Sequence, residues 1–212
     1  MINSLLLLIS IILILMSYVR IILNFIKTKN IKNDTLTGFD ITKELTLNYD
    51  EINIVESREI TISKYNLKRK IIRLTSKDYN SNDIFTLAKT SLLSGYALIN
   101  TNKNIDLLSK ILPSIDYLNK SSLIALIISL LAKSIGDAKI AIVLLIIILI
   151  YQYLINEINI TSKEETTNHL KKILSNKEYN LLSSVQDSYL FLNKISFITT
   201  LILILREILI II

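Results

Sequence analysis

Residues able to hold a catalytic metal are scarce in this chain. His169 is the single histidine among 212 residues, and the chain has no cysteine. A hydrolytic zinc site typically uses three protein ligands, such as two imidazoles and a carboxylate, and leaves a fourth position for water. One copy of this chain cannot build that site unless a second chain supplies ligands. His169 itself lies in a predicted helix beside Lys171 and Lys172, where a solvated side chain is expected.

The helix predicted over residues 83–100 should position whatever chemistry the chain has. Its apolar side chains recur every three or four residues and share one face that we expect to be buried: Ile84, Ala88, Leu92, Tyr96 and Ile99. The polar side chains of Asn80, Ser81 and Asn82 precede the helix and are candidates to cap its first turn. An ordinary core helix explains this pattern without any catalytic role.

This helix resembles the metal-binding helix of the membrane-bound neutral zinc metallopeptidases of the YugP type. The family sequence there is H-E-x-G-H-A, in which the two histidines bind zinc and the glutamate activates a metal-bound water. Gly95 and Ala97 match its glycine and alanine. Leu92 and Tyr96 stand at the histidine positions and Leu93 at the glutamate position. The resemblance therefore implies a catalytic motif that has been lost.

Glu157 is the candidate for the third ligand of that family. The family supplies a glutamate from V-E-x-x-A-S at the end of a membrane helix, and Asn156–Thr161 is the matching stretch. The alternative is a solvated glutamate at a membrane boundary, which we favour because one carboxylate seldom holds zinc alone. We predict no metal and no other cofactor. Leu92, Tyr96 and Glu157 then mark only the positions equivalent to the ligands, and Leu93 the position of the general base.

The resemblance extends from Leu36 onward in the order and spacing of the segments. The family motifs T-G-x-x-V and K-x-V-x-L-S are matched by Thr37, Gly38 and Ile41 and by Lys70, Ile72, Leu74 and Thr75. In the family motif D-H-Y-D-P, Ser63, Lys64 and Leu67 replace the first, second and last residues around Tyr65 and Asn66. Pro113 matches a proline of the family. The resemblance implies that the scaffold is kept where the chemistry is not.

The composition is that of a membrane protein. Hydrophobic residues make up 51% of the chain, and its mean hydropathy is +0.49. Four apolar segments are expected to enter the bilayer: Leu5–Ile26, Leu123–Ala132, Ile140–Ile155 and Ile195–Ile212. We interpret the first as an uncleaved anchor rather than a signal peptide, because no basic residue precedes it and no small-x-small pattern follows it. The middle two predict a membrane hairpin, with a re-entrant first arm as the alternative.

Basic residues lie mainly between the apolar segments. The chain has 24 Lys and Arg against 18 Asp and Glu, a net charge of +6. Lys27, Lys29 and Lys32 directly follow the first segment, so the positive-inside rule predicts that residues 27–120 and 157–192 are cytoplasmic. Arg206 and Glu207 interrupt the last segment and need no catalytic role near a membrane exit. No aromatic and basic platform appears, so we expect no nucleic-acid partner.

The predicted fold class is an α+β membrane protein, mainly helical, with about four membrane segments and a small three-stranded sheet packed on a zincin-like helix. Alternating residues predict strands around Ile52 and Ile54 and around Ile60 and Ile62, and a third strand over residues 70–75, after a short helix near residues 40–47. Capping boxes predict helices that begin at Ser162 and Ser175. The expected domains are 1–27, an N-terminal transmembrane anchor; 28–120, a zincin-like domain; 121–156, a membrane hairpin; 157–192, a helical segment; and 193–212, a C-terminal transmembrane helix.

These observations favour an integral membrane pseudo-peptidase that lacks the metal ligands and the general base. We expect its partners to be the lipid bilayer and an active paralogous peptidase or another membrane protein. Two alternatives remain open at this point. The chain can be an active zinc metallopeptidase with non-standard ligands or ligands from a second chain, or it can be a purely structural membrane subunit.

Overall fold

The structure is a computed structural model that describes residues 2–60, 62–66, 69–103 and 115–212, without the side chains of residues 100–103 and 115–120. Within these residues the chain is mainly helical with one three-stranded sheet, as predicted. It divides into two compact units. We call residues 1–20, 115–157 and 189–212 the bundle unit, and residues 21–114 and 158–188 the sheet unit. Leu67 and Pro113 lie outside the described residues.

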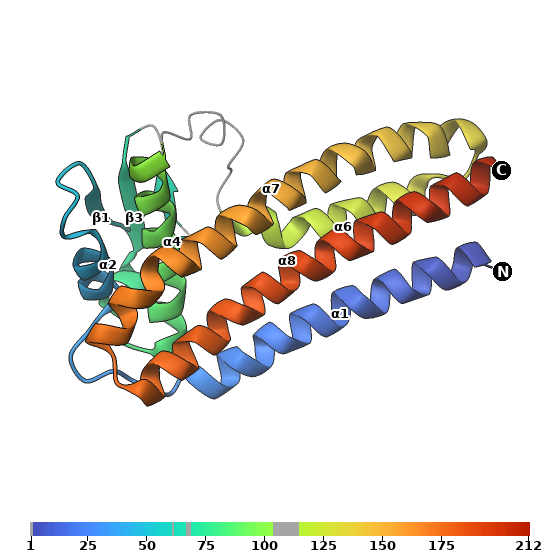
Figure 1. Cartoon of the computed structure of the whole chain (residues 1–212). Helices are drawn as coiled ribbons and strands as arrows, with labels where there is room; N and C mark the ends of the chain where they lie inside the picture. Colours follow the sequence, from blue (N-terminus) through green and yellow to red (C-terminus); the bar gives the residue numbers. More distant parts are fainter. Residues whose placement is uncertain (1, 61, 67–68, 104–114) are drawn as a thin grey trace. The chain divides into compact units, whose positions relative to one another are not determined.

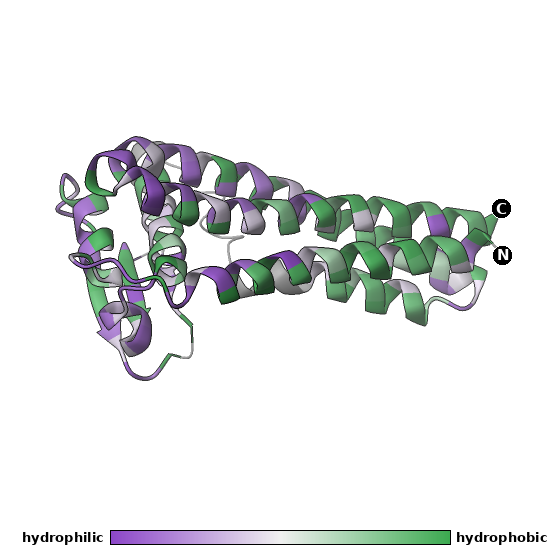
Figure 2. Cartoon of the chain, turned by 90° about the horizontal axis from the view of Figure 1, so that it is seen from below, coloured by the Kyte–Doolittle hydropathy of each residue, from purple (hydrophilic) through white to green (hydrophobic). Residues whose placement is uncertain are grey.

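The bundle unit contains parts of four helices (Figure 1): α1 (Ile2–Thr28), α6 (Ile115–Leu131), α7 (Ile135–Ile173) and α8 (Asn176–Ile211). Its core cluster consists of Ala125, Leu145 and Leu203, which are fully buried. Leu7 of α1 packs against this cluster, so side chains from all four helices meet there. Figure 2 shows that apolar residues dominate these helices within the bundle unit.

In the bundle unit, polar side chains tend to be buried and large apolar ones exposed. On α1, Ser10 and Ser17 are fully buried, whereas Leu15 and Met16 are 58% and 59% exposed. The side chains of α6 and α8 follow the same division. The buried ones include Ser122, Ser129, Thr199 and Thr200, and the exposed ones include Ile127, Leu131, Leu201 and Leu205. Helices at the surface of a water-soluble protein show the opposite arrangement.

Two described helices, α1 and α7, are long and apolar enough to cross a membrane. The apolar stretch Ser121–Leu131 of α6 is shorter, so the prediction of about four membrane segments is not confirmed by length and composition. The prediction that a new helix begins at Ser162 is wrong, because α7 runs through this residue without interruption. Neither glycine nor proline occurs between Glu157 and Ser162 to end the helix.

The sheet has the order β1-β3-β2, formed by β1 (Asn53–Ser57), β2 (Lys64–Asn66) and β3 (Ile71–Thr75). β1 is parallel and β2 antiparallel to the central β3. The first and third strands lie close to their predicted positions. The second differs, since the structure forms it after Ile60 and Ile62. Asn66 Oδ1 accepts a hydrogen bond of 3.1 Å from the backbone of Arg69, which helps turn the chain from β2 into β3.

Three further helices lie wholly within the sheet unit: α2 (Gly38–Thr46), α3 (Ser76–Asn80) and α4 (Ile84–Lys103). Thr37 and Asp40 form a capping box at the start of α2, which confirms the helix predicted near residues 40–47. Gly38 is buried against α3, and a Cβ atom on it would lie 2.0 Å from the carbonyl oxygen of Asp78. Only glycine permits this close approach of the two backbones. α4 contacts β2 and β3, as predicted for the zincin-like helix.

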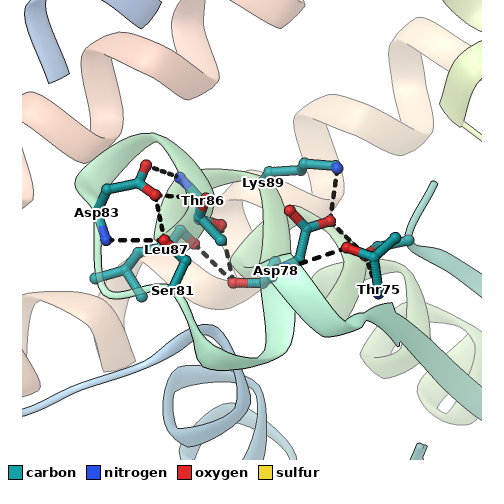
Figure 3. Close-up of polar contacts among 9 residues, drawn as sticks. Thr75, Asp78, Ser81, Asp83, Thr86, Leu87 and Lys89 are labelled. Atoms are coloured by element: carbon teal, nitrogen blue, oxygen red, sulfur yellow. Dashed lines mark hydrogen bonds and ion pairs between the residues drawn. The ribbon is translucent and has the colours of Figure 1, made fainter. Parts of the chain in front are cut away.

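Asp83 caps α4, in place of the residues that the sequence pattern favours. Its carboxylate accepts hydrogen bonds from the backbone and the hydroxyl of Thr86 at 2.9 and 2.8 Å (Figure 3). Ser81 instead ends α3 and donates its hydroxyl to Asp83, and the amide of Asn82 donates to the backbone of Asn33 at 2.8 Å. The second capping box is confirmed: Ser175 and Glu178 exchange hydrogen bonds of 3.4 and 3.1 Å at the start of α8.

Candidate functional site

The residues that the resemblance assigns to the two histidines and the general base of the family, Leu92, Tyr96 and Leu93, lie in a fully buried part of α4. All nine residues from Ser91 to Ile99 are buried, on every side of the helix. Leu92, Leu93 and Tyr96 are 5%, 1% and 8% exposed. This stretch therefore offers no open face to which a peptide substrate can bind.

Tyr96 is held by a hydrogen bond from its phenol to Oδ1 of Asn159 on α7. Both residues are buried, with Asn159 4% exposed. A buried phenol or amide oxygen without a partner is costly, and this contact satisfies both groups at once. The residue at the second histidine position thus serves to join α4 to α7.

Gly95 brings the backbones of α4 and α7 together next to this bond. A Cβ atom on Gly95 would lie 2.1 Å from Ser162 Oγ and 2.5 Å from the Ser162 carbonyl oxygen. The Ser162 hydroxyl donates to the Leu92 carbonyl at 2.8 Å, across the same contact. The glycine that matches the family motif is therefore required for helix packing in this chain.

A third hydrogen bond joins α4 to α8. Gln186, which is 1% exposed, donates its amide to Ser91 Oγ at 3.0 Å. Ser91 directly precedes the residue at the first histidine position. Side chains of α7 and α8 thus hold this part of α4 by hydrogen bonds to Ser91, Leu92 and Tyr96.

A second polar cluster, at the sheet end of α4, contains a serine, a lysine and a carboxylate. Asp78 Oδ2 accepts hydrogen bonds from Ser63 Oγ and from Lys89 Nζ, the latter at 2.7 Å (Figure 3). Burial raises the pKa of Asp78, but the charge of Lys89 and hydrogen bonds from Lys89, Ser63 and Thr75 outweigh it and lower the pKa. The Ser63 hydroxyl is fully buried and donates to Asp78 rather than to Lys89. The cluster therefore joins α3, α4 and the sheet and is not an activated nucleophile.

Comparison with known proteins identifies the family. The sequence model of the family described as "Putative neutral zinc metallopeptidase" matches residues 3–205. The chain belongs to this family of neutral zinc metallopeptidases. The resemblance seen in the sequence is thus confirmed at the level of the family. No match is found among curated proteins or among solved structures.

The donor atoms present do not fit the zinc site that membership of the neutral zinc metallopeptidases implies. The side chains of Leu92 and Leu93 have no atom that binds a metal or transfers a proton. The Tyr96 phenol donates its hydrogen bond to Asn159 Oδ1, so these two oxygens are already engaged with each other. Within the described residues, no three His, Cys, Asp or Glu side chains are grouped to hold a metal ion. No hydrolytic step through zinc can be derived from these side chains.

The third predicted ligand position, Glu157, lies on α7, as does the single histidine, His169. Glu157 is exposed and belongs to the bundle unit, whereas Leu92 and Tyr96 belong to the sheet unit. His169 is half-buried, three turns along α7 from Glu157. Asn159 and Gln186 were not predicted to contact α4, because nothing in their spacing in the sequence indicates that they reach it.

Proposed function

We propose that this member of the neutral zinc metallopeptidases is a membrane-embedded pseudo-peptidase that keeps the scaffold of the family and binds a partner protein instead of hydrolysing peptides. The observation that carries the proposal is the Tyr96–Asn159 hydrogen bond beside buried Leu92 and Leu93. Apolar packing and a satisfied hydrogen bond occupy the positions of the ligands. A helix stabilised in this way has no need of a metal.

The division of side chains in the bundle unit supports integration into a bilayer. Lipid tails solvate large apolar side chains, so membrane helices expose them and use small or polar residues where helices meet. Ser10 and Ser17 on α1 are buried and Leu15 and Met16 exposed, as this rule requires. Buried alanines fit the same rule: Ala125 on α6, Ala138 and Ala141 on α7, and Ala132 between these helices. We therefore propose four membrane segments, with α6 and α8 in addition to α1 and α7.

The charges support one orientation of these segments. Lys27, Lys29 and Lys32 follow the apolar part of α1, and Arg20 lies 4.5 Å from the ring centre of Phe191, an arrangement suited to the edge of a membrane. By the positive-inside rule, residues 27–120 and 157–192 are cytoplasmic.

The partner we propose is a membrane protein, with an active peptidase of the same family as the first candidate. The closed surroundings of α4 disfavour binding through the former substrate face, because Ser91–Ile99 is buried. They equally disfavour the alternative in which a second chain adds zinc ligands beside Leu92 or Tyr96. Exposed apolar side chains on α1, such as Leu15 and Met16, are the better surface for a partner within the bilayer.

Zinc content tests the loss of the metal site. We expect the full chain, purified in detergent and measured by inductively coupled plasma mass spectrometry, to contain far less than one zinc per chain. An active member of the family purified in parallel is the positive control. A stoichiometric zinc ion that survives chelation would contradict the proposal and favour the active peptidase.

Photo-crosslinking in native membranes tests the partner. A photo-reactive residue at exposed Met16 should capture one specific membrane protein, and the same residue at buried Ser17 serves as the control. Capture of lipid alone at Met16 would favour the purely structural subunit.

A further inference from the structure

Buried polar atoms without hydrogen-bond partners are concentrated in the bundle unit. Among the described residues, all but one of these atoms lie there, and the exception is Ser76 Oγ in the sheet unit. They include Gln152 Oε1 on α7 and Ser196 Oγ, Thr199 Oγ1 and Glu207 Oε2 on α8. A buried polar atom without a hydrogen-bond partner destabilises the fold, and a buried water molecule can supply the missing hydrogen bond. The interior of the bundle is therefore suited to bind water.

A charged layer lies near the ends of α6 and α8 and consists of Ser129, Arg206 and Glu207. Arg206 Nη1 donates to the Ser129 carbonyl at 2.6 Å and to Ser129 Oγ at 2.8 Å, and it also contacts Glu207 Oε1. Ser129 Oγ donates to the same oxygen of Glu207. Glu207 is fully buried, and its second oxygen, Oε2, has no partner. This oxygen is placed to accept a hydrogen bond or a proton.

A polar layer lies farther along the bundle and consists of Gln152, Ser196 and Thr199. Gln152 donates its amide to Ser121 Oγ of α6 at 3.1 Å, which leaves Oε1 without a partner. The ring centres of Tyr153 on α7 and Phe197 on α8 are 6.5 Å apart, so α7 and α8 lie near each other where Gln152 and Ser196 directly precede these rings. Gln152 and Ser196 are both buried.

An apolar layer separates the polar layer from the charged layer. It is the core cluster of Ala125, Leu145 and Leu203. On α8, Leu203 lies four residues after Thr199 and four before Glu207, a rise of about 6 Å in each direction. On α6, Ala125 likewise lies four residues before Ser129. α8 thus carries the order polar, apolar, charged, and α6 contributes Ala125 to the apolar layer and Ser129 to the charged layer.

We propose that the interior of the bundle is a proton pathway, in which Glu207 binds the proton and the apolar layer closes the path. The proposal rests on the membrane integration proposed above. Water bound to the polar layer would conduct protons on one side of the apolar layer, and water bound to the charged layer would conduct them on the other. Between them, a dry constriction at Leu145 and Leu203 blocks passage by excluding water. A carboxylate that faces the interior of a membrane bundle is the kind of group that binds protons in transport proteins.

Proton transfer at Glu207 balances without any other reactant. A hydronium ion beside Oε2 gives its proton to the carboxylate, an O–H bond forms on Oε2, and a water molecule remains. Release of the proton to water on the other side of the apolar layer restores the carboxylate of Glu207. Arg206 contacts the other oxygen of the same carboxylate, Glu207 Oε1, from the same helix. Around them α6 supplies the Ser129 hydroxyl, α7 carries exposed Asp137 and Lys139 near its start, and α1 has no charged side chain before Arg20.

Proton flux into liposomes tests this pathway. The full chain is reconstituted into vesicles that contain a pH-sensitive dye, and a potassium gradient with valinomycin drives protons inward. We expect the wild type to stay close to empty vesicles, because the apolar layer is closed. Leu203→Ser should raise the initial rate at least tenfold, and Leu145→Ser serves as a second opening variant in case the first fails to fold. Leu205→Ser is the matched control, since Leu205 is 49% exposed on the same helix.

The dependence on Glu207 decides the outcome. Adding Glu207→Gln to either opening variant should return the rate to that of the wild type. Equal rates for the opening variants and Leu205→Ser, or a raised rate that persists without Glu207, would overturn the pathway. Extraction of the same membranes with alkaline carbonate separates the two proposals. Release of the protein from the membranes contradicts membrane integration. If the protein is retained and the opening variants show no increase in proton flux, the pathway alone is contradicted.

Discussion

The sheet unit and the bundle unit bury polar groups in different ways. Around α4, the buried side chains of Ser91, Tyr96, Asn159 and Ser162 are hydrogen bonded to neighbouring helices or their side chains. In the bundle unit, buried atoms such as Glu207 Oε2 and Thr199 Oγ1 have no partner. The surroundings of α4 are thus closed and their polar groups hydrogen bonded, whereas the bundle unit keeps buried oxygens that can still accept a hydrogen bond.

The largest expected effect comes from adding a methyl group where α4 meets α7. Gly95→Ala forces a Cβ against the Ser162 carbonyl, and we expect a loss of about 3 kcal/mol or more in the free energy of unfolding, because backbone must move. Gly136→Ala in the bundle unit is the control, since its nearest atom is 3.7 Å away. Thermal unfolding in detergent measures both. Equal effects of the two substitutions would show that α4 is not tightly packed.

The next effect is that of removing the charge of Asp78. Asp78→Asn should cost about 2–3 kcal/mol, because it weakens charge-assisted hydrogen bonds from Lys89 and Ser63. The exposed Asp50 offers the control Asp50→Asn, with no change expected.

The same carboxylate predicts a dependence on pH. Because the pKa of Asp78 is lowered in the folded state, its stabilisation is present above the pKa of the unfolded chain, near 4. It is lost as the pH falls through the lower pKa of the folded state. Unfolding measured from pH 6 down to pH 3 should therefore show a smaller decrease for Asp78→Asn than for the wild type. An identical decrease in both would contradict this assignment.

A smaller effect compares the two kinds of buried oxygen directly. Tyr96→Phe leaves Asn159 Oδ1 without the phenol and should cost about 1–2 kcal/mol. Thr199→Val in the bundle unit removes a hydroxyl that has no protein partner, so its cost should be at most about half of that. Stabilities of the two single variants, measured under one condition, check the ranking. If Thr199→Val costs more than Tyr96→Phe, the contrast between the units is wrong.

The smallest effect is that of metal removal. We expect the melting temperature of the full chain to be unchanged, within experimental error, by a strong chelator, because packing replaces the ligands around Leu92 and Tyr96. A decrease of several degrees that added zinc reverses would contradict the loss of the site.

Local patterns in the sequence predicted much of the fold, and contacts between distant residues account for what they missed. The spacing of Ile84, Ala88 and Leu92 indicated α4, and apolar length indicated α1 and α7. The capping pattern at Ser162 was misleading, because the Ser162 hydroxyl donates its hydrogen bond to the carbonyl oxygen of Leu92, seventy residues away in the sequence. Similarly, β2 lies where it can pair with β3, and not where Ile60 and Ile62 alternate.

The surroundings of the candidate site were not predictable from the sequence. The assignment of Leu92, Leu93 and Tyr96 to the zinc-ligand and general-base positions of the family rests on the resemblance and stays a prediction. Asn159 and Gln186 are polar residues without a motif, and only the packing of α7 and α8 brings them to α4. The burial of Glu207 beside Ser129 also depends on helices that are far apart in sequence.

Gly38 and Gly95 bear on how relatives of this chain should be sorted. Each admits a neighbouring backbone, of Asp78 or Ser162, at a distance that any larger residue would prevent. If this chain is the pseudo-peptidase proposed above, packing alone accounts for both glycines. A genome survey that counts peptidases by overall similarity would then include it, and the residues aligned with Leu92, Leu93 and Tyr96 would set it apart from active members.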